Sequence, residues 1–248
     1  MDSDNPKLIT IVGDSLPQVS SDQKISYQET YPFLLQRMFD ANKYLVKLSS
    51  RSTNQVIKQS SSDNLNTDVL YNNSEYVVIH LGIVDCAPRL FGYIEDRIVF
   101  VLSHVPVVKI FINLVIKFKS KYRRFFTKHF PKTYITRKIF KEKYSFIVKE
   151  IKNKSNPKKI FIINIADTSE KNKYRSYNFE KNILDYNKIL KDIYSENSDF
   201  CELIDFHSET LKNKKLIIED EGIHLTREGH RYLAGLIYNK IQENIKNN

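Results

Sequence analysis

The chain has 248 residues, of which 41% are hydrophobic and 12% aromatic, and this composition excludes an intrinsically disordered protein. Its net charge of +10 is local, because Lys117–Lys143 holds eleven basic residues against the single acid Glu142 and the rest is formally neutral. Two cysteines, Cys86 and Cys201, are too few for a disulfide framework, so we expect reduced thiols. No cysteine–histidine cluster has metal-ligand spacing, so we expect no bound metal.

Strands and helices are expected to alternate along the chain. Apolar runs predict five strands, at Lys7–Val12, Tyr44–Leu48, Tyr76–Leu81, Lys159–Ala166 and Glu202–Phe206. Apolar residues at helical spacing predict helices at Tyr27–Phe39, Thr136–Ile151, Phe179–Tyr194 and Thr226–Ile245. The polar stretch Ser49–Asp68 is expected to be a long loop. This order is typical of a three-layer α/β/α domain that spans residues 1–248, with helices on both faces of a parallel sheet.

The segment Arg97–Asn153 does not follow this alternation. Its apolar parts, Ile98–Leu102 and Val105–Phe118, are interrupted by polar residues, whereas a membrane span needs about 20 apolar residues with few charges. Bases and aromatics then alternate as far as Tyr134. We interpret residues 97–153 as a basic helical insertion after the third strand, which forms a cap or an interaction surface. The alternative is a solvated basic face of a helical layer.

The first expected strand ends at Gly13–Leu16, which presents Ser15 directly after an apolar run. Ligands of parallel sheets bind beyond the carboxyl ends of strands, and Ser15 lies at such an end. A serine nucleophile needs a histidine base that an acid orients. His224 suits this role, because it precedes the last helix and follows Asp220 and Glu221, either of which could hold its Nδ1–H. A turn serine and a solvated acidic loop are the alternatives.

These motifs together resemble the SGNH, or GDSL, hydrolase family. The resemblance rests on Gly-Asp-Ser-Leu after the first strand, Gly-x-x-Asp after the third, and acid-x-x-His near the C-terminus; it spans Leu8–Ala234 apart from the insertion. It implies a flavodoxin-like sheet of five parallel strands, no cofactor and an acyl-enzyme mechanism. It also implies that Ser15 is the nucleophile and an oxyanion donor, His224 the base, and Glu221 the orienting acid where the family normally has aspartate.

Two departures from the family concern the oxyanion hole. The family signature Gly-x-Asn-Asp reads Gly82-Ile83-Val84-Asp85 here, so Val84 stands where the family has an asparagine donor. The family also has a glycine after the second strand, whereas no glycine lies between Asp14 and Leu81. That role falls to a backbone N–H near Ser49–Ser52, or to no residue. Losing one such donor costs about 10²–10³-fold in rate, so this divergent site is slow, rebuilt or inactive.

The residues after the third strand form the expected oxyanion and substrate region, which includes Gly82, Asp85 and Arg89. Arg89 suits a carboxylate or phosphate on the substrate. Alternatively, it caps local carbonyls or pairs with Asp85. Cys86 has no neighbour in the sequence that would lower its thiol pKa, so we interpret it as structural.

We therefore expect a serine-dependent ester hydrolase or acyl transferase, which the resemblance suggests acts on acetyl or other short acyl esters of carbohydrates. The alternative is a catalytically impaired protein of the same fold that binds an anionic membrane surface or an acidic polysaccharide through Lys117–Lys143. Nucleic acid is not an expected partner, because no recognised motif accompanies the charge. Met1–Asp4 lacks the basic start of a secretion signal, so we expect a cytoplasmic protein, at most peripheral at the inner membrane face.

Overall fold

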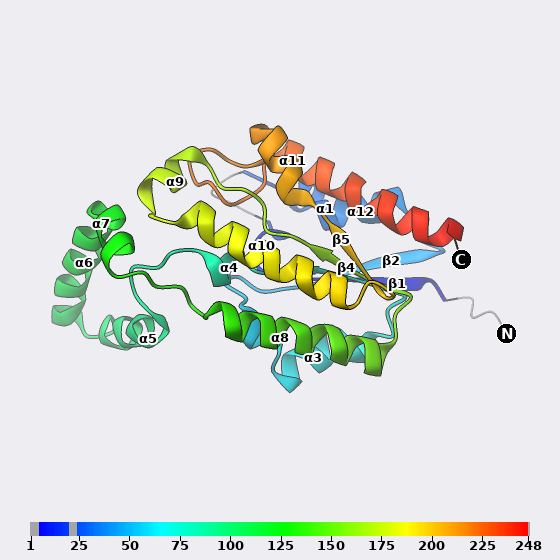
Figure 1. The fold of residues 1–248 in the computed structure, drawn as a ribbon, viewed down its shortest axis with the longest axis horizontal. Helices are drawn as coiled ribbons and strands as arrows, with labels where there is room; N and C mark the ends of the chain where they lie inside the picture. The colour runs from blue at the N-terminus through cyan, green and yellow to red at the C-terminus, as the bar shows by residue number, and fades with distance from the viewer. Residues whose placement is uncertain (1–4, 20–23, 248) are drawn as a thin grey trace.

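The computed structural model describes residues 5–19 and 24–247 and contains one sheet of five parallel strands (Figure 1). The strands lie in the order β2-β1-β3-β4-β5, which places β1 and β3 in the interior of the sheet. Their bounds are β1 Lys7–Gly13, β2 Tyr44–Ser50, β3 Tyr76–His80, β4 Lys159–Ile163 and β5 Cys201–Ile204. All four neighbouring pairs are parallel. The predicted three-layer α/β/α fold is confirmed.

Helices cover both faces of the sheet, because alternate residues of each buried strand point to opposite sides. On one face, Val77 and Ile79 of β3 pack in a cluster with helices α2, α3, α8 and α10. On the other face, Tyr76 and Val78 pack in a cluster with α1 and α12. The bounds of these helices are α1 Tyr31–Met38, α2 Val56–Gln59, α3 Ser62–Asp68, α8 Arg137–Glu150, α10 Phe179–Glu196 and α12 Arg227–Asn247.

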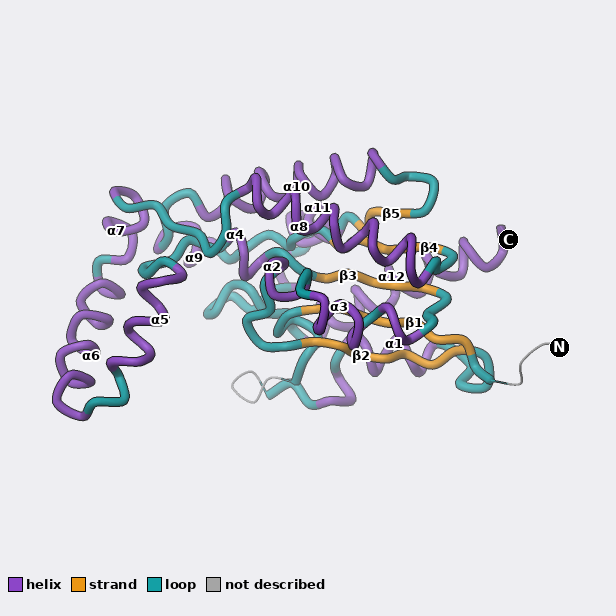
Figure 2. Tube along the Cα trace, turned by 90° about the horizontal axis from the view of Figure 1, so that it is seen from below, coloured by secondary structure: helices purple, strands orange, loops and turns teal. Residues whose placement is uncertain are grey.

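Three helices between β3 and β4 project beyond the carboxyl ends of the strands, and we call α5, α6 and α7 together the arm (Figures 1 and 2). Their bounds are α5 Tyr93–Leu102, α6 Pro106–Lys121 and α7 Arg123–His129. Helix α8, which follows them, instead buries Phe140, Tyr144 and Ile147 against the sheet. The projecting part is therefore shorter than the predicted insertion. Within the described residues, no helix is both long and apolar enough to cross a bilayer.

The remaining elements are short. They are the helices α4 Ile83–Cys86, α9 Glu170–Arg175 and α11 Phe206–Lys212, the 3₁₀ turns Tyr27–Glu29, Leu70–Asn72 and Lys214–Leu216, and the π turn Ile151–Ser155. Helix α4 follows β3, α9 lies between β4 and α10, and α11 follows β5 directly. They therefore lie at the carboxyl ends of three strands, where the candidate site residues also lie.

The prediction of a long loop at Ser49–Asp68 is wrong, because this stretch contains α2 and α3. Both helices are anchored by a few buried side chains, which include Val56 and Leu65. The buried Asp68 accepts hydrogen bonds from the Arg51 guanidinium and from the Gln59 amide. A polar sequence can therefore fold against the part of the chain outside the arm, which we call the body, when its few apolar residues reach the core.

Strands β3, β4 and β5 end earlier than predicted, β3 by one residue and the other two for local reasons. Strand β4 stops at Ile163, since the Asn187 side chain takes both the N–H and the C=O of Ile165, at 2.7 and 2.8 Å. Strand β5 stops at Ile204, because Asp205 accepts the N–H of Ser208 at 3.1 Å and so begins α11. Side-chain caps of this kind compete with the sheet for backbone groups.

Candidate active site

The turn after β1 fixes the position of Ser15. The Asp14 carboxylate accepts the backbone N–H of Leu16 at 2.8 Å, and the N–H of Gln18 donates to the carbonyl of Ser15 at 3.1 Å. A side chain at Gly13 would place its Cβ 2.7 Å from the Pro17 ring. The chain therefore needs glycine here to turn this sharply at the carboxyl end of β1.

Ser15, His224 and Glu221 form one connected row of hydrogen bonds. The Oγ of Ser15 lies 3.0 Å from Nε2 of His224. On the other side of the ring, Nδ1 of His224 contacts Oε1 of Glu221, and the backbone N–H of His224 donates to Oε2 at 3.4 Å. Because a carboxylate only accepts, it fixes the proton on Nδ1 and leaves Nε2 to receive the serine proton. This is the arrangement of a nucleophile, a base and an orienting acid.

The acid and the base share one tight loop between Ile217 and Leu225, which pair as an isolated antiparallel bridge. The N–H of Gly222 donates to the carbonyl of Ile218 at 2.7 Å. Gly222 has φ +81°, a backbone conformation that side chains disfavour. Glycine here lets the chain reverse within the three residues that separate the acid from the histidine.

Side chains in and just before α9 donate hydrogen bonds to backbone carbonyls of this loop. The Asn172 amide donates to the carbonyl of Glu221 at 2.7 Å, and the Thr168 hydroxyl donates to the carbonyl of Gly222 at 2.5 Å. A Cβ at Gly222 would lie 2.3 Å from Oγ of Ser169. Thr168 and Asn172 were not predicted from the sequence, since polar side chains that bind a distant backbone leave no periodic signal.

The structure separates the two candidate acids. Asp220 has a side chain that is 95% exposed and pairs with Lys171 at 3.0 Å. Glu221, by contrast, is the acid that contacts the ring of His224. Of these two carboxylates, Glu221 is therefore the one placed to orient the ring of His224.

The segment after β2 lies against the nucleophile turn, because Ser50 pairs with Gly13 in the sheet. The N–H of Arg51 and the side-chain amide of Asn54 both donate to the carbonyl of Gly13, at 3.3 and 3.1 Å. Asn54 is buried and also donates to Gln59 at 2.8 Å. Asn54 was not predicted from the sequence. Within the predicted donor segment Ser49–Ser52, the N–H of Arg51 is already used by its bond to Gly13.

The segment after β3 supplies no side-chain donor at position 84. Val84 lies in α4 with only 7% of its surface exposed and packs in the apolar cluster that also includes Leu16. Gly82 has φ +133°, which begins α4 immediately after the strand. The neighbouring Asp85 is fully buried, and each carboxylate oxygen lies 3.3 Å from the N–H of Val56. Asp85 therefore joins α4 to α2.

Two carboxyl groups beside the site are buried, and burial raises the pKa of each. Burial raises the pKa of Asp14 to about 7, although the N–H of Leu16 and the charge of His224 lower it. Burial also raises the pKa of Asp85 well above its usual value, against the N–H of Val56. A protonated carboxyl avoids the cost of a buried charge, so both groups favour the neutral form.

Arg89 and Cys86 make structural contacts. The Arg89 guanidinium donates to the carbonyl of Val84 at 3.0 Å and lies 4.1 Å from the ring centre of Tyr134. This is the local capping contact that the sequence left open as an alternative. Burial raises the pKa of the Cys86 thiol, so its reactive thiolate form is disfavoured.

Two further histidines, His80 at the carboxyl end of β3 and His230 in α12, are buried in the core. The phenol of Tyr31 lies 3.2 Å from Nδ1 of His80, and the N–H of Tyr31 donates to Nδ1 of His230 at 3.1 Å. Burial lowers the pKa of His80 to about 3 and that of His230 to about 4. Both rings are therefore neutral at pH 7.

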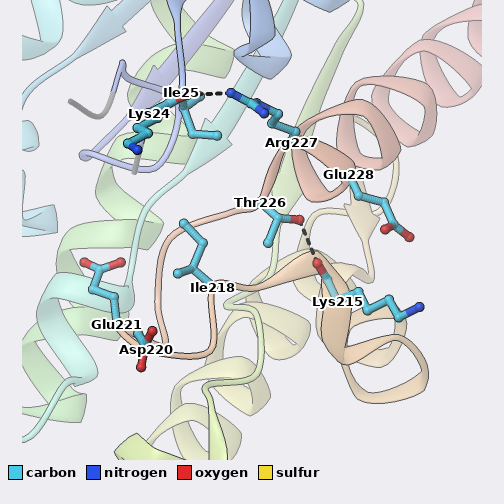
Figure 3. Close-up of a pocket in the computed structure, with 9 residues that line it drawn as sticks. All are labelled: Lys24, Ile25, Lys215, Ile218, Asp220, Glu221, Thr226, Arg227 and Glu228. Carbon is cyan, nitrogen blue, oxygen red and sulfur yellow. Dashed lines mark hydrogen bonds between the residues drawn. The ribbon is translucent and has the colours of Figure 1, made fainter. Parts of the chain in front are cut away.

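A hollow of about 740 Å³ adjoins the acid loop (Figure 3). It is lined by Lys24, Ile25, Lys215, Ile218, Asp220, Glu221, Thr226, Arg227 and Glu228. Glu221 lines the hollow and also contacts His224, whereas Ser15 and His224 are not among the described lining residues of the hollow. The hollow therefore lies on the acid's side of the site. Among the described residues, no three His, Cys, Asp or Glu side chains are grouped to hold a metal ion.

The sequence profile of the GDSL-like lipase/acylhydrolase family matches residues 11–232. The chain belongs to this family. No curated protein matches it in sequence.

Solved structures with the same fold cover nearly the whole chain. A lipase/acylhydrolase from Enterococcus faecalis is 16% identical, with a TM-score of 0.64 and 96% of each chain covered. An acetylxylan esterase from Geobacillus stearothermophilus is 14% identical, with a TM-score of 0.63 and coverage of 97% of this chain and 96% of the other. A second acetyl xylan esterase is 17% identical, with a TM-score of 0.62 and coverage of 94% and 99%. At such identities, the likeness establishes the fold alone.

Proposed function

We propose that the protein is a serine-dependent ester hydrolase that uses Ser15, His224 and Glu221. The observation that carries this proposal is the 3.0 Å contact between Oγ of Ser15 and Nε2 of His224, with Glu221 on the opposite ring nitrogen. Membership of the GDSL-like lipase/acylhydrolase family supports the same chemistry.

The reaction proceeds in two acyl-transfer steps. Oγ of Ser15 attacks the carbonyl carbon while Nε2 of His224 takes the hydroxyl proton. The bond to the alcohol then breaks, and His224 returns the proton to the departing oxygen. Water attacks the acyl-enzyme by the reverse route and regenerates Ser15. If another hydroxyl replaces water, the same site performs acyl transfer.

The oxyanion is stabilised by backbone groups in this proposal. The N–H of Ser15 is the donor that we assign, while Val84 supplies none from its side chain. Each missing donor costs about 10²–10³-fold in rate, so we expect slower turnover than in a site with the asparagine. The second candidate function is binding alone, by a protein that keeps the fold but has lost catalytic activity.

Short acyl esters of carbohydrates are the substrate class that we propose. Two structures with this fold are described as acetylxylan esterases, which supports an acetylated sugar.

The two cysteines are buried and free, which agrees with the expected cytoplasmic location, and that location stays a prediction.

Labelling with a fluorophosphonate tests the proposal without knowledge of the substrate. The wild type should be labelled, whereas Ser15→Ala and His224→Ala should each lose labelling and the hydrolysis of a short-chain aryl ester. Combining them should cause no further loss, since the two groups act as a unit. Ser145→Ala on α8 is the matched control and should keep full labelling. Labelling that persists in Ser15→Ala refutes the proposal, and an unlabelled but folded wild type favours the binding function.

A further inference from the structure

The arm leaves a continuous apolar stripe of α6 uncovered. Val107, Ile110, Phe111, Leu114 and Phe118 recur at the spacing of one helix face. Their exposed fractions are 80, 67, 68, 60 and 57% in that order. Large exposed apolar patches on soluble proteins mark contact surfaces, so this face is a candidate for one.

The stripe is not the face that holds the arm together. A second face of α6, roughly 100° around the helix from the stripe, carries Val108, Ile112 and Val115, which are buried or half-buried. Helix α6 therefore has two apolar faces, of which internal packing uses one. The tip between α5 and α6 adds Phe100, at 67% exposed, and Val105, at 48%. Figure 2 shows this tip at the end of the molecule farthest from the N-terminus.

The charges around the stripe have one sign. The sequence from Arg97 to Lys141 contains no Asp or Glu. Lys117 and Lys121 follow Leu114 and Phe118 by three residues, which places each lysine beside the stripe on the helix surface. An apolar face with a basic border fits a surface that offers hydrocarbon and negative charge together.

We propose that the arm docks on a bilayer that contains anionic phospholipids, with the α6 stripe in the acyl-chain boundary and the lysines at the headgroups. A second copy of the chain fits less well, because it would bring two acid-free basic faces together. An acidic polysaccharide offers charge but no hydrocarbon for the stripe. The proposal does not depend on catalysis, and vesicle binding is measured independently of it.

Two arginines of the arm act as anchors to the body and are left intact in the test. Arg123 donates to the carbonyl of Pro88 and to the hydroxyl of Ser176, both at 2.7 Å. Arg124 donates to the carbonyls of Lys173, at 3.4 Å, and Tyr174. Replacing either would alter how the arm is held as well as its charge.

The test is cosedimentation of the full chain with vesicles of phosphatidylcholine alone or mixed with phosphatidylglycerol, at low and high salt. The wild type should bind only the mixed vesicles, and binding should fall steeply with salt because exposed charges are screened over about 10 Å at 0.1 M. Replacing Lys117, Lys121 and Lys128 with glutamine should weaken binding about 100-fold, at roughly fivefold per lysine. The matched control replaces Lys188, Lys191 and Lys246, and should bind like the wild type.

A second variant tests the stripe itself. Ile110→Ser, Phe111→Ser and Leu114→Ser together should abolish binding, while the same change at the exposed Ile57, Leu184 and Leu211 should not. Absence of wild-type binding to the mixed vesicles, or equal binding by the stripe variant, overturns the proposal. So does a dimer in sedimentation velocity that the stripe variant dissociates, because a second copy is then the occupant.

Discussion

The body buries its apolar side chains, whereas the arm exposes most of its own. In the body, β3 is buried along its whole length from Tyr76 to His80. In the arm, Ile112 and Thr127 are the only buried residues among those whose side chains the structure describes, and more than half of the exposed large apolar side chains among the described residues lie between Ile94 and Phe130. The apolar residues of the body pack in its core, whereas those of the arm stay exposed and available to a partner. Under the two proposals, chemistry and attachment belong to separate parts of one chain.

The largest expected contrast between the two regions is in catalysis. Glu221→Gln should lower ester hydrolysis by about 10²–10⁴-fold, because it removes the charge that orients and stabilises the base. Asp220→Asn and the arm stripe variant should keep the rate on a soluble aryl ester. Steady-state kinetics on folded variants measure this ranking. A reversed order of the two acids would move the orienting role to Asp220.

The next largest contrast is expected in the free energy of unfolding of variants in the body and in the arm. Phe140→Ala removes a fully buried ring of α8 and should cost about 3–5 kcal/mol in the free energy of unfolding. Phe111→Ala removes a ring that is 68% exposed and should change it by less than about 0.5 kcal/mol. Urea unfolding followed by circular dichroism measures both. Similar losses would mean that the arm packs as tightly as the body.

A gain of function is expected at one position of the body. Val84→Asn restores a side-chain amide where the family has one, and should raise the rate by up to about 10²-fold if it reaches the oxyanion. The control Val84→Thr places a hydroxyl at the same buried site without the longer reach of the amide. An unchanged rate in a folded Val84→Asn would show that another donor already fills the place.

The last expected contrast concerns pH and belongs to the body alone. Since the folded pKa of Asp14 is raised from 3.8 to about 7, its contribution to stability is full below pH 3.8 and is lost as the pH rises to about 7. Against Asp14→Asn, which does not titrate, the wild type should lose about 1.4 kcal/mol per pH unit between roughly pH 4 and 7. Parallel stability curves for the two proteins would contradict the raised pKa.

The sequence predicted those parts that depend on local pattern. The five strands were found from apolar runs, and the structure brings Ser15, His224 and Glu221 together from two short motifs. It did not predict α2 and α3, whose anchors are a few side chains in a polar stretch. Nor did it predict Asn54 or Asn172, because each acts by donating to the backbone of a segment more than forty residues away.

The separation of 209 residues between Ser15 and His224 has a consequence for synthesis. At about 5–20 residues per second, the nucleophile leaves the ribosome roughly 10–40 s before its base. The strands that flank β1 can pair during this interval, but the nascent chain holds a serine without a proton acceptor. In the proposed mechanism, acyl chemistry therefore begins only after the loop that carries His224 has been made and has folded against the turn of Ser15.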